Sequence, residues 1–137
     1  MPVIIAETKA GQPVILYTSS DGVSITTSTT YQLKAQLSIL NVQIGDVWDF
    51  WWSCEVYNDT SNDYVQVRFR NATSGVTFAE AMLAMDGVGQ TKDYHALAGI
   101  MRYTMANAGT NQINLEWRVD LGNGYIRRAR IRARRVS

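Results

Sequence analysis

The residues of this chain that could carry catalytic chemistry are one histidine, one cysteine and two carboxylates. His95 could act as a general base, but no serine or cysteine nucleophile motif surrounds it, so we expect a polar residue in or beside a strand. Cys54 is the single cysteine, which excludes an internal disulfide and a cysteine cluster for a metal. Asp49 and Glu55 are six residues apart on one predicted strand, about 20 Å at ~3.3 Å per residue, whereas glycosidase carboxylates are roughly 5 to 9.5 Å apart. The sequence therefore predicts a protein that is not an enzyme, with no catalytic residues, no metal site and no cofactor.

Two aromatic residues, Trp51 and Tyr57, share the polar face of that strand with the carboxylates. An exposed aromatic ring beside carboxylates can stack on a sugar, but aromatic residues on an outer face are also typical of subunit interfaces. We favour the interface and keep a bound glycan as the alternative, so both residues are candidate partner-binding residues. The glycines follow no phosphate-binding spacing, which argues against a nucleotide site.

The C-terminal end of the chain is strongly basic, with six arginines between positions 127 and 135. Residues 1–100 carry five Lys/Arg against ten Asp/Glu, and residues 101–137 carry eight Arg against two acids, so a charge of −5 faces +6. This asymmetry indicates either internal charge pairing or contact with an acidic partner, such as another copy of the chain. Lysine is nearly absent and only Tyr125 could stack on a base nearby, which argues against nucleic acid. Arginine binds carboxylates in a bidentate manner, so we expect a protein partner.

Strict alternation of apolar and polar residues predicts strands through most of the chain. Between residues 23 and 39 the apolar residues occupy the odd positions, as in one strand or two strands end to end. Between residues 48 and 56 the even positions are apolar, and this places Cys54 inward as a small buried hydrophobe. Residues 64–70 and 112–121 repeat the pattern, and turns rich in Gly, Asn and Asp separate the segments.

Two segments are ambiguous, but they do not change the fold class. Residues 78–86 could form a helix or a strand, and residues 94–105 are apolar on both faces, as a strand buried on both sides would be. A chain of 137 residues with 46% hydrophobic residues can build one core. The sequence predicts an all-β fold, a single antiparallel β-sandwich domain over residues 1–137, with jelly-roll topology.

The last two predicted strands, about 112–121 and 125–136, are expected to form a C-terminal hairpin. A three-residue loop at 122–124 places Trp117 opposite Ala129, whereas a two-residue loop would turn the arginines onto the apolar face, at a large desolvation cost. The three-residue loop predicts a basic outer stripe, with Arg118 directly opposite Arg128. The candidate partner-binding residues of this stripe are Arg118, Arg128, Arg130, Arg132 and Arg134.

The C-terminal segment AGTNQINLEWRVDLGNGYIRRARIRARRVS resembles the C-terminal hairpin of small β-sandwich virion proteins of tailed phages, such as capsid decoration (cement) proteins and fibre tips. The resemblance covers about the last quarter of the chain. It implies a structural protein, often trimeric, that braces the major capsid protein at the capsid surface. The alternative that it implies is the carbohydrate- or receptor-binding tip of a phage fibre.

The N-terminal sequence completes these expectations. Pro2 and Pro13 suit an extended or edge segment, so we expect residues 1–16 to contact a neighbouring subunit. No signal peptide and no apolar stretch of membrane-spanning length is recognisable, so we expect synthesis in a host cytoplasm and a final location in the virion.

Overall fold

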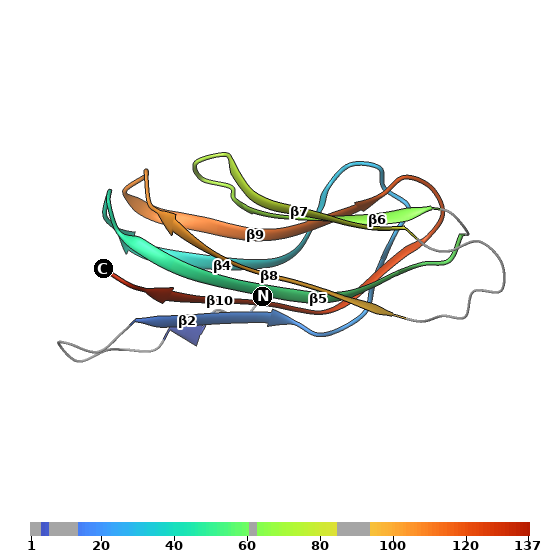
Figure 1. The fold of residues 1–137 in the computed structure, drawn as a ribbon, viewed down its shortest axis with the longest axis horizontal. Helices are drawn as coiled ribbons and strands as arrows, with labels where there is room; N and C mark the ends of the chain where they lie inside the picture. The colour runs from blue at the N-terminus through green and yellow to red at the C-terminus, as the bar shows by residue number, and fades with distance from the viewer. Residues whose placement is uncertain (1–3, 6–13, 61–62, 85–93) are drawn as a thin grey trace.

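The computed structural model describes residues 4–5, 14–60, 63–84 and 94–137, which form two antiparallel sheets packed face to face (Figure 1). The six-stranded sheet contains β1 (Ile4–Ile5), β2 (Ile15–Ser20), β3 (Ser24–Thr26), β5 (Val47–Asn58), β8 (His95–Thr104) and β10 (Gly124–Arg135). The four-stranded sheet contains β4 (Gln32–Val42), β6 (Tyr64–Asn71), β7 (Val76–Ala84) and β9 (Gly109–Val119). The predicted all-β sandwich is confirmed. None of the described residues belongs to a helix with the length and hydropathy of a membrane span.

The strand order gives the sandwich its jelly-roll path. The six-stranded sheet has the order β1-β2-β10-β5-β8, with β3 pairing β10 beyond the end of β2, and the four-stranded sheet has the order β4-β9-β6-β7. From β3 onward the chain changes sheet at every connection except the hairpin that joins β6 and β7. Consecutive strands are therefore mostly not neighbours, as expected for a jelly roll.

The core lies between the sheets and is built by the predicted alternation. The even positions of β5 from Trp48 to Val56 are buried, and so are the odd positions of β9 from Ile113 to Val119. Phe50 connects the two layers, because its ring centroid lies 5.9 Å from that of Phe69 and 5.6 Å from that of Phe78 in the opposite sheet. The inward faces of β5 and β9 could thus be identified from the sequence.

Cys54 points into this core, as predicted, and is 2% exposed. Burial raises the pKa of its thiol to about 12, so the reactive thiolate is nearly absent at neutral pH. We expect a disulfide reagent such as Ellman's reagent to leave the native protein unlabelled at about pH 8 and to label one thiol per chain in concentrated guanidinium chloride. Rapid labelling of the native protein, followed spectrophotometrically, would contradict the buried position.

The predicted C-terminal hairpin is wrong, although both of its strands exist. β9 pairs with β4 and β6, whereas β10 pairs with β2, β3 and β5, so the two strands lie in different sheets. A hairpin requires that the two strands joined by the short loop share a sheet, but here residues 120–123 cross from one sheet to the other. The apolar faces of β9 and β10 meet across the core instead of side by side. Gly122, and not Gly124, has a positive φ in this connection, 74°.

The structure decides three assignments that the sequence left open. Residues 78–86 are strand as far as Ala84, and the remaining two lie outside the described residues. The region 94–105 forms β8, but it is not buried on both sides, because β8 is an edge strand with one face against the core and Ile100 68% exposed on the other. Residues 23–39 form two successive strands, β3 and β4.

The expected N-terminal segment, residues 1–16, is only partly described. Ile15 and Leu16 belong to β2 and pair with β10 of the same chain, so this end of the segment is part of the protein's own sheet. β1 pairs with β2 as a short outer strand. Residues 1–3 and 6–13 lie outside the described residues.

Candidate functional site

The outer face of the six-stranded sheet brings aromatic, aliphatic and basic side chains into one row. In the strand register, Tyr17 on β2 is opposite Arg132 on β10, Arg132 is opposite Trp51 on β5, and Trp51 is opposite Ile100 on β8. Successive residues of a strand point to opposite faces, so residues in register across the sheet share a face. Four residues that are far apart in the sequence therefore form a continuous band.

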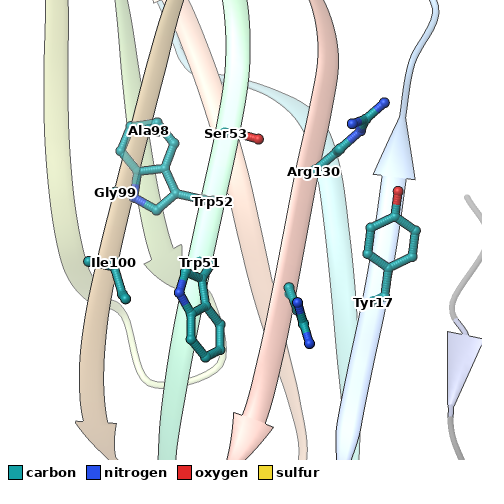
Figure 2. A pocket seen from close by; sticks show the side chains of 9 residues that line it. Tyr17, Trp51, Trp52, Ser53, Ala98, Gly99, Ile100 and Arg130 are labelled. Atoms are coloured by element: carbon teal, nitrogen blue, oxygen red, sulfur yellow. The ribbon is translucent and has the colours of Figure 1, made fainter.

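The next row on this face has small side chains on β5 and β8, and these leave a hollow. Ser19 is opposite Arg130, Arg130 is opposite Ser53, and Ser53 is opposite Ala98. Ser53 and Ala98 are too short to fill the space beside the large side chains of the first row. The result is an open hollow of about 560 Å³, called the outer groove below. It is lined by Tyr17, Trp51, Trp52, Ser53, Ala98, Gly99, Ile100, Arg130 and Arg132, most of which are labelled in Figure 2.

The carboxylates of this face are held by arginines on both sides of the outer groove. Asp49 accepts hydrogen bonds from Arg102 at 2.7 Å and from Arg134 at 3.4 Å. Its pKa is lowered, mainly by the hydrogen bond from Arg102 and further by the nearby positive charges. The ion pairs stabilise the charged form of Asp49, so this carboxylate cannot act as a proton donor near neutral pH.

Glu55, further along β5, is also held by two arginines. It accepts hydrogen bonds from Arg127 at 2.7 Å and from Arg128 at 3.1 Å, and the hydrogen bond from Arg127 is the main reason that its pKa is lowered. Arg130 lies 3.3 Å from Asp21. These acids all come from the acidic first 100 residues, so internal pairing accounts for much of the charge asymmetry in the sequence.

Arg132 differs from the other arginines of this face. Among the described residues it has no carboxylate within ion-pair distance, and its guanidinium lies 5.6 Å from the ring centroid of Trp51. A cation over an indole face is favourable, but this contact does not neutralise the charge. The outer groove therefore combines exposed carbon surface with one uncompensated positive charge.

The structure brings together four of the five arginines that were predicted to form a stripe. Arg128, Arg130, Arg132 and Arg134 point outward from β10, as predicted. The placement of Arg118 with them is wrong: it lies on β9 in the other sheet, so the expected like-charge contact with Arg128 does not exist.

The side chain of Arg118 is held by residues near it in the structure, away from β10. Its Nε and Nη2 atoms donate to Oε1 of Gln66 at 2.9 and 2.6 Å, and its guanidinium lies 5.0 Å from the ring centroid of Tyr31. On the same sheet, Glu116 of β9 pairs with Arg68 of β6 at 2.5 Å.

The two predicted aromatic residues have different surroundings. Trp51 is half-buried in the outer groove, whereas Tyr57 is only 5% exposed and packs against Tyr125 and Tyr94, with ring centroids 5.3 and 6.1 Å away. Tyr57 therefore stabilises the end of the sheet and lies outside the groove. His95 is exposed at the start of β8. Among the described residues, no group of His, Cys, Asp and Glu has the arrangement of a metal site.

Three of the nine residues that line the outer groove, Trp51, Arg130 and Arg132, were predicted from the sequence, and the other six, among them Tyr17 and Ile100, were not. Tyr17 occupies an ordinary alternating position of β2, and nothing local marks it as a binding residue. Ile100 was assigned to the core because its segment is apolar on both faces. The outward position of Ile100 would follow if the segment were taken as an edge strand, because an edge strand can keep apolar residues on its outer face.

No protein-family model matches the chain, and no curated protein matches it. Among solved structures, the chain is similar to VP2 of infectious bursal disease virus in its subviral particle, with a TM-score of 0.61, 9% identity, and coverage of 90% of this chain and 33% of that chain. A structure of the Gt strain of infectious bursal disease virus gives a TM-score of 0.62 at 9% identity, with the same coverage. The Eiger TNF of S. frugiperda gives 0.55 at 10% identity, covering 88% of this chain and 92% of that chain.

These similarities show the fold alone, because fewer than one residue in seven is identical. The chain has the jelly-roll fold of viral capsid VP2 and of TNF domains. It spans about a third of the length of the infectious bursal disease virus chains that it matches.

Proposed function

We propose that this protein is a non-enzymatic virion structural protein, a capsid decoration protein that stabilises the head by binding the major capsid protein. The observation that carries the proposal is the outer groove, where Trp51, Tyr17 and Arg132 lie in one row on the outer face of the six-stranded sheet. Aromatic residues and arginine are the residues that protein interfaces prefer, and they supply most interface hot spots. The jelly-roll fold, shared with a protein of a viral particle, supports a place in the virion.

The decoration function also assigns roles to the other predicted partner-binding features. A homo-oligomer, for example a trimer, would present several copies of the outer groove to the repeating capsid surface and so raise the overall affinity. The N-terminal residues would add a second contact to a neighbouring subunit. The basic face needs no nucleic acid in this proposal, because most of its arginines are paired within the chain.

The second candidate is a carbohydrate- or receptor-binding tip of a phage fibre. Trp51 in the open groove favours it, since an exposed indole face can stack on the apolar face of a sugar. The two functions differ in what the Trp51→Ala variant should lose, retention on glycans for a fibre tip and affinity for assembled capsids for a decoration protein.

The decoration function is tested by cosedimentation of the purified protein with assembled capsids of the virus that encodes it. We expect saturable binding that weakens as salt is raised, because ion pairs across an interface are screened. We expect Arg132→Glu to weaken binding about tenfold or more, because it places a negative charge where the interface needs a positive one. Arg135→Glu is the matched control: it makes the same charge change on the same strand, outside the outer groove, and we expect less than about a twofold effect.

Light scattering after size exclusion, at low and high salt, would give the oligomeric state of the same samples. Absence of capsid binding by the wild-type protein would overturn the decoration function. A glycan array that then retains the wild-type protein and not Trp51→Ala would establish the fibre-tip alternative.

A further inference from the structure

We propose that the outer groove binds an extended protein segment that carries a carboxylate side chain two residues away from a large apolar side chain. The carboxylate pairs with Arg132, and the apolar side chain enters the hollow over Ser53 and Ala98. This inference rests on the proposed function, because it names the chemistry of the partner at the same site.

The charge of the ligand follows from the charge balance of the sheet face. Arg127 and Arg128 share Glu55, Arg134 pairs with Asp49, and Arg130 pairs with Asp21. Arg132 lies on β10 between Arg130 and Arg134, and within the described part of the chain it forms no ion pair with a carboxylate. A carboxylate from outside would complete the pattern, and the planar guanidinium suits bidentate pairing with it.

The spacing of the ligand groups follows from the geometry of the sheet. Arg130 is in register with Ser53, and Arg132 is two residues further along the same strand. Arg132 is therefore diagonal to Ser53, and such positions are roughly 7–8 Å apart. Side chains at positions i and i+2 of an extended segment lie on one face about 6.6 Å apart, which matches this distance.

The chemistry of the groove favours a peptide over a sugar or a nucleic acid. Carbon surfaces of Tyr17, Trp51, Ala98 and Ile100 form much of the lining, and Ile100 is 68% exposed without a bound partner. Besides its apolar face, a sugar carries several hydroxyl groups that need hydrogen-bonding partners, and this surface offers few of them. A nucleic acid strand needs a row of free cations, whereas the neighbouring arginines are already paired.

The inference is tested with a library of short random peptides displayed on phage and selected on the immobilised wild-type protein. We expect the selected sequences to be enriched in Asp or Glu two residues from Leu, Ile, Phe or Trp. The Kd of one selected synthetic peptide is then measured by fluorescence anisotropy. We expect Arg132→Glu to weaken binding at least about tenfold, Arg132→Gln to have a smaller effect, and Arg135→Glu to change it less than about twofold.

Charge reversal on the peptide gives the decisive comparison. The same peptide with its acid replaced by Lys should bind Arg132→Glu more tightly than it binds the wild-type protein. The protein variants Arg132→Glu and Arg132→Gln should fold normally, because Arg132 contributes no ion pair among the described residues. A selection without the acidic–apolar spacing, or a Kd that is indifferent to charge at position 132, would overturn the inference.

Tryptophan fluorescence shows whether the peptide occupies the groove. Trp51 is half-buried, whereas Trp48, Trp52 and Trp117 are at most 4% exposed, so acrylamide should quench mainly Trp51. We expect the bound peptide to protect this emission and the Trp51→Phe variant to lose the effect. Protection that persists in Trp51→Phe would place the peptide elsewhere and overturn the inference.

The failure of this inference is distinguishable from the failure of the proposed function. Capsid binding that is unchanged in Arg132→Glu would overturn the inference and leave the decoration function standing. Peptide binding with the expected charge dependence, but without capsid binding, would overturn the decoration function and leave the peptide inference standing. Retention on acidic glycans, in the absence of any selected peptide, would overturn the peptide as the occupant.

Discussion

Replacing Phe50 by alanine is expected to destabilise the protein by about 3–5 kcal/mol. Phe50 is fully buried, and its ring lies against Trp48 of its own strand and against Phe69 and Phe78 of the opposite sheet. Truncation removes these contacts and leaves a cavity between two sheets whose strands restrict collapse around it. Urea denaturation followed by far-UV circular dichroism would measure the loss as a lower midpoint.

The control for Phe50→Ala is Ile100→Ala, a large apolar side chain on the outer face of the same sheet. Ile100 is 68% exposed, so we expect a change in unfolding free energy within about 0.5 kcal/mol. The control also separates stability from binding, because Ile100→Ala should weaken the peptide selected on the outer groove. A small effect of Phe50→Ala, comparable to the control, would contradict the packing of the two sheets around this ring.

Replacing Gly99 by alanine is the second change with a large expected effect. A Cβ atom at this position would lie 2.3 Å from Nε1 of Trp52 and 2.7 Å from its Cε2, well inside contact distance. Trp52 is 4% exposed and packs on Phe69 at a centroid distance of 6.2 Å, so its indole cannot move without disturbing the core. We expect a cost of about 1–3 kcal/mol, typical of overpacking, measured by urea denaturation.

Two further variants make the Gly99 prediction specific. Gly22→Ala is the matched control, because nothing lies within 4 Å of a Cβ built there, and we expect a change within about 0.5 kcal/mol. In the double variant Gly99→Ala/Trp52→Phe the smaller ring relieves the clash. We therefore expect the double variant to lose less stability than the two single variants together. Simple additivity would show that the indole is not the cause of the cost.

Alternation was sufficient to predict most strands and the direction of their side chains. The apolar residues that the two-residue period assigns to the inside of β5, β6 and β9 are buried. The prediction succeeds because a pleated strand has the same period, so burial of one face leaves a direct trace in the sequence. The outward direction of Arg130 and Arg132 followed from the same period and from the cost of burying a charge.

The candidate site was only partly predictable, for a reason that Arg118 illustrates. Its outward direction was correct, but its neighbours were not, since β9 and β10 lie in different sheets. A short connection between two strands is compatible both with a hairpin and with a crossing between sheets. The local residues do not distinguish these two paths, because the choice depends on which strands occupy the remaining places in each sheet.

The sequence by itself determined the all-β class, the inward face of most strands, the inert position of Cys54 and the outward arginines of β10, because each depends on local periodicity and on desolvation. Only the tertiary structure decided the strand neighbours, which join Tyr17, Trp51, Ile100 and Arg132 into one groove. It also decided that β8 is an edge strand and that Arg132 lacks an acid among the described residues. These features depend on pairing between residues far apart in the chain, and a period of two carries no information about which strands pair.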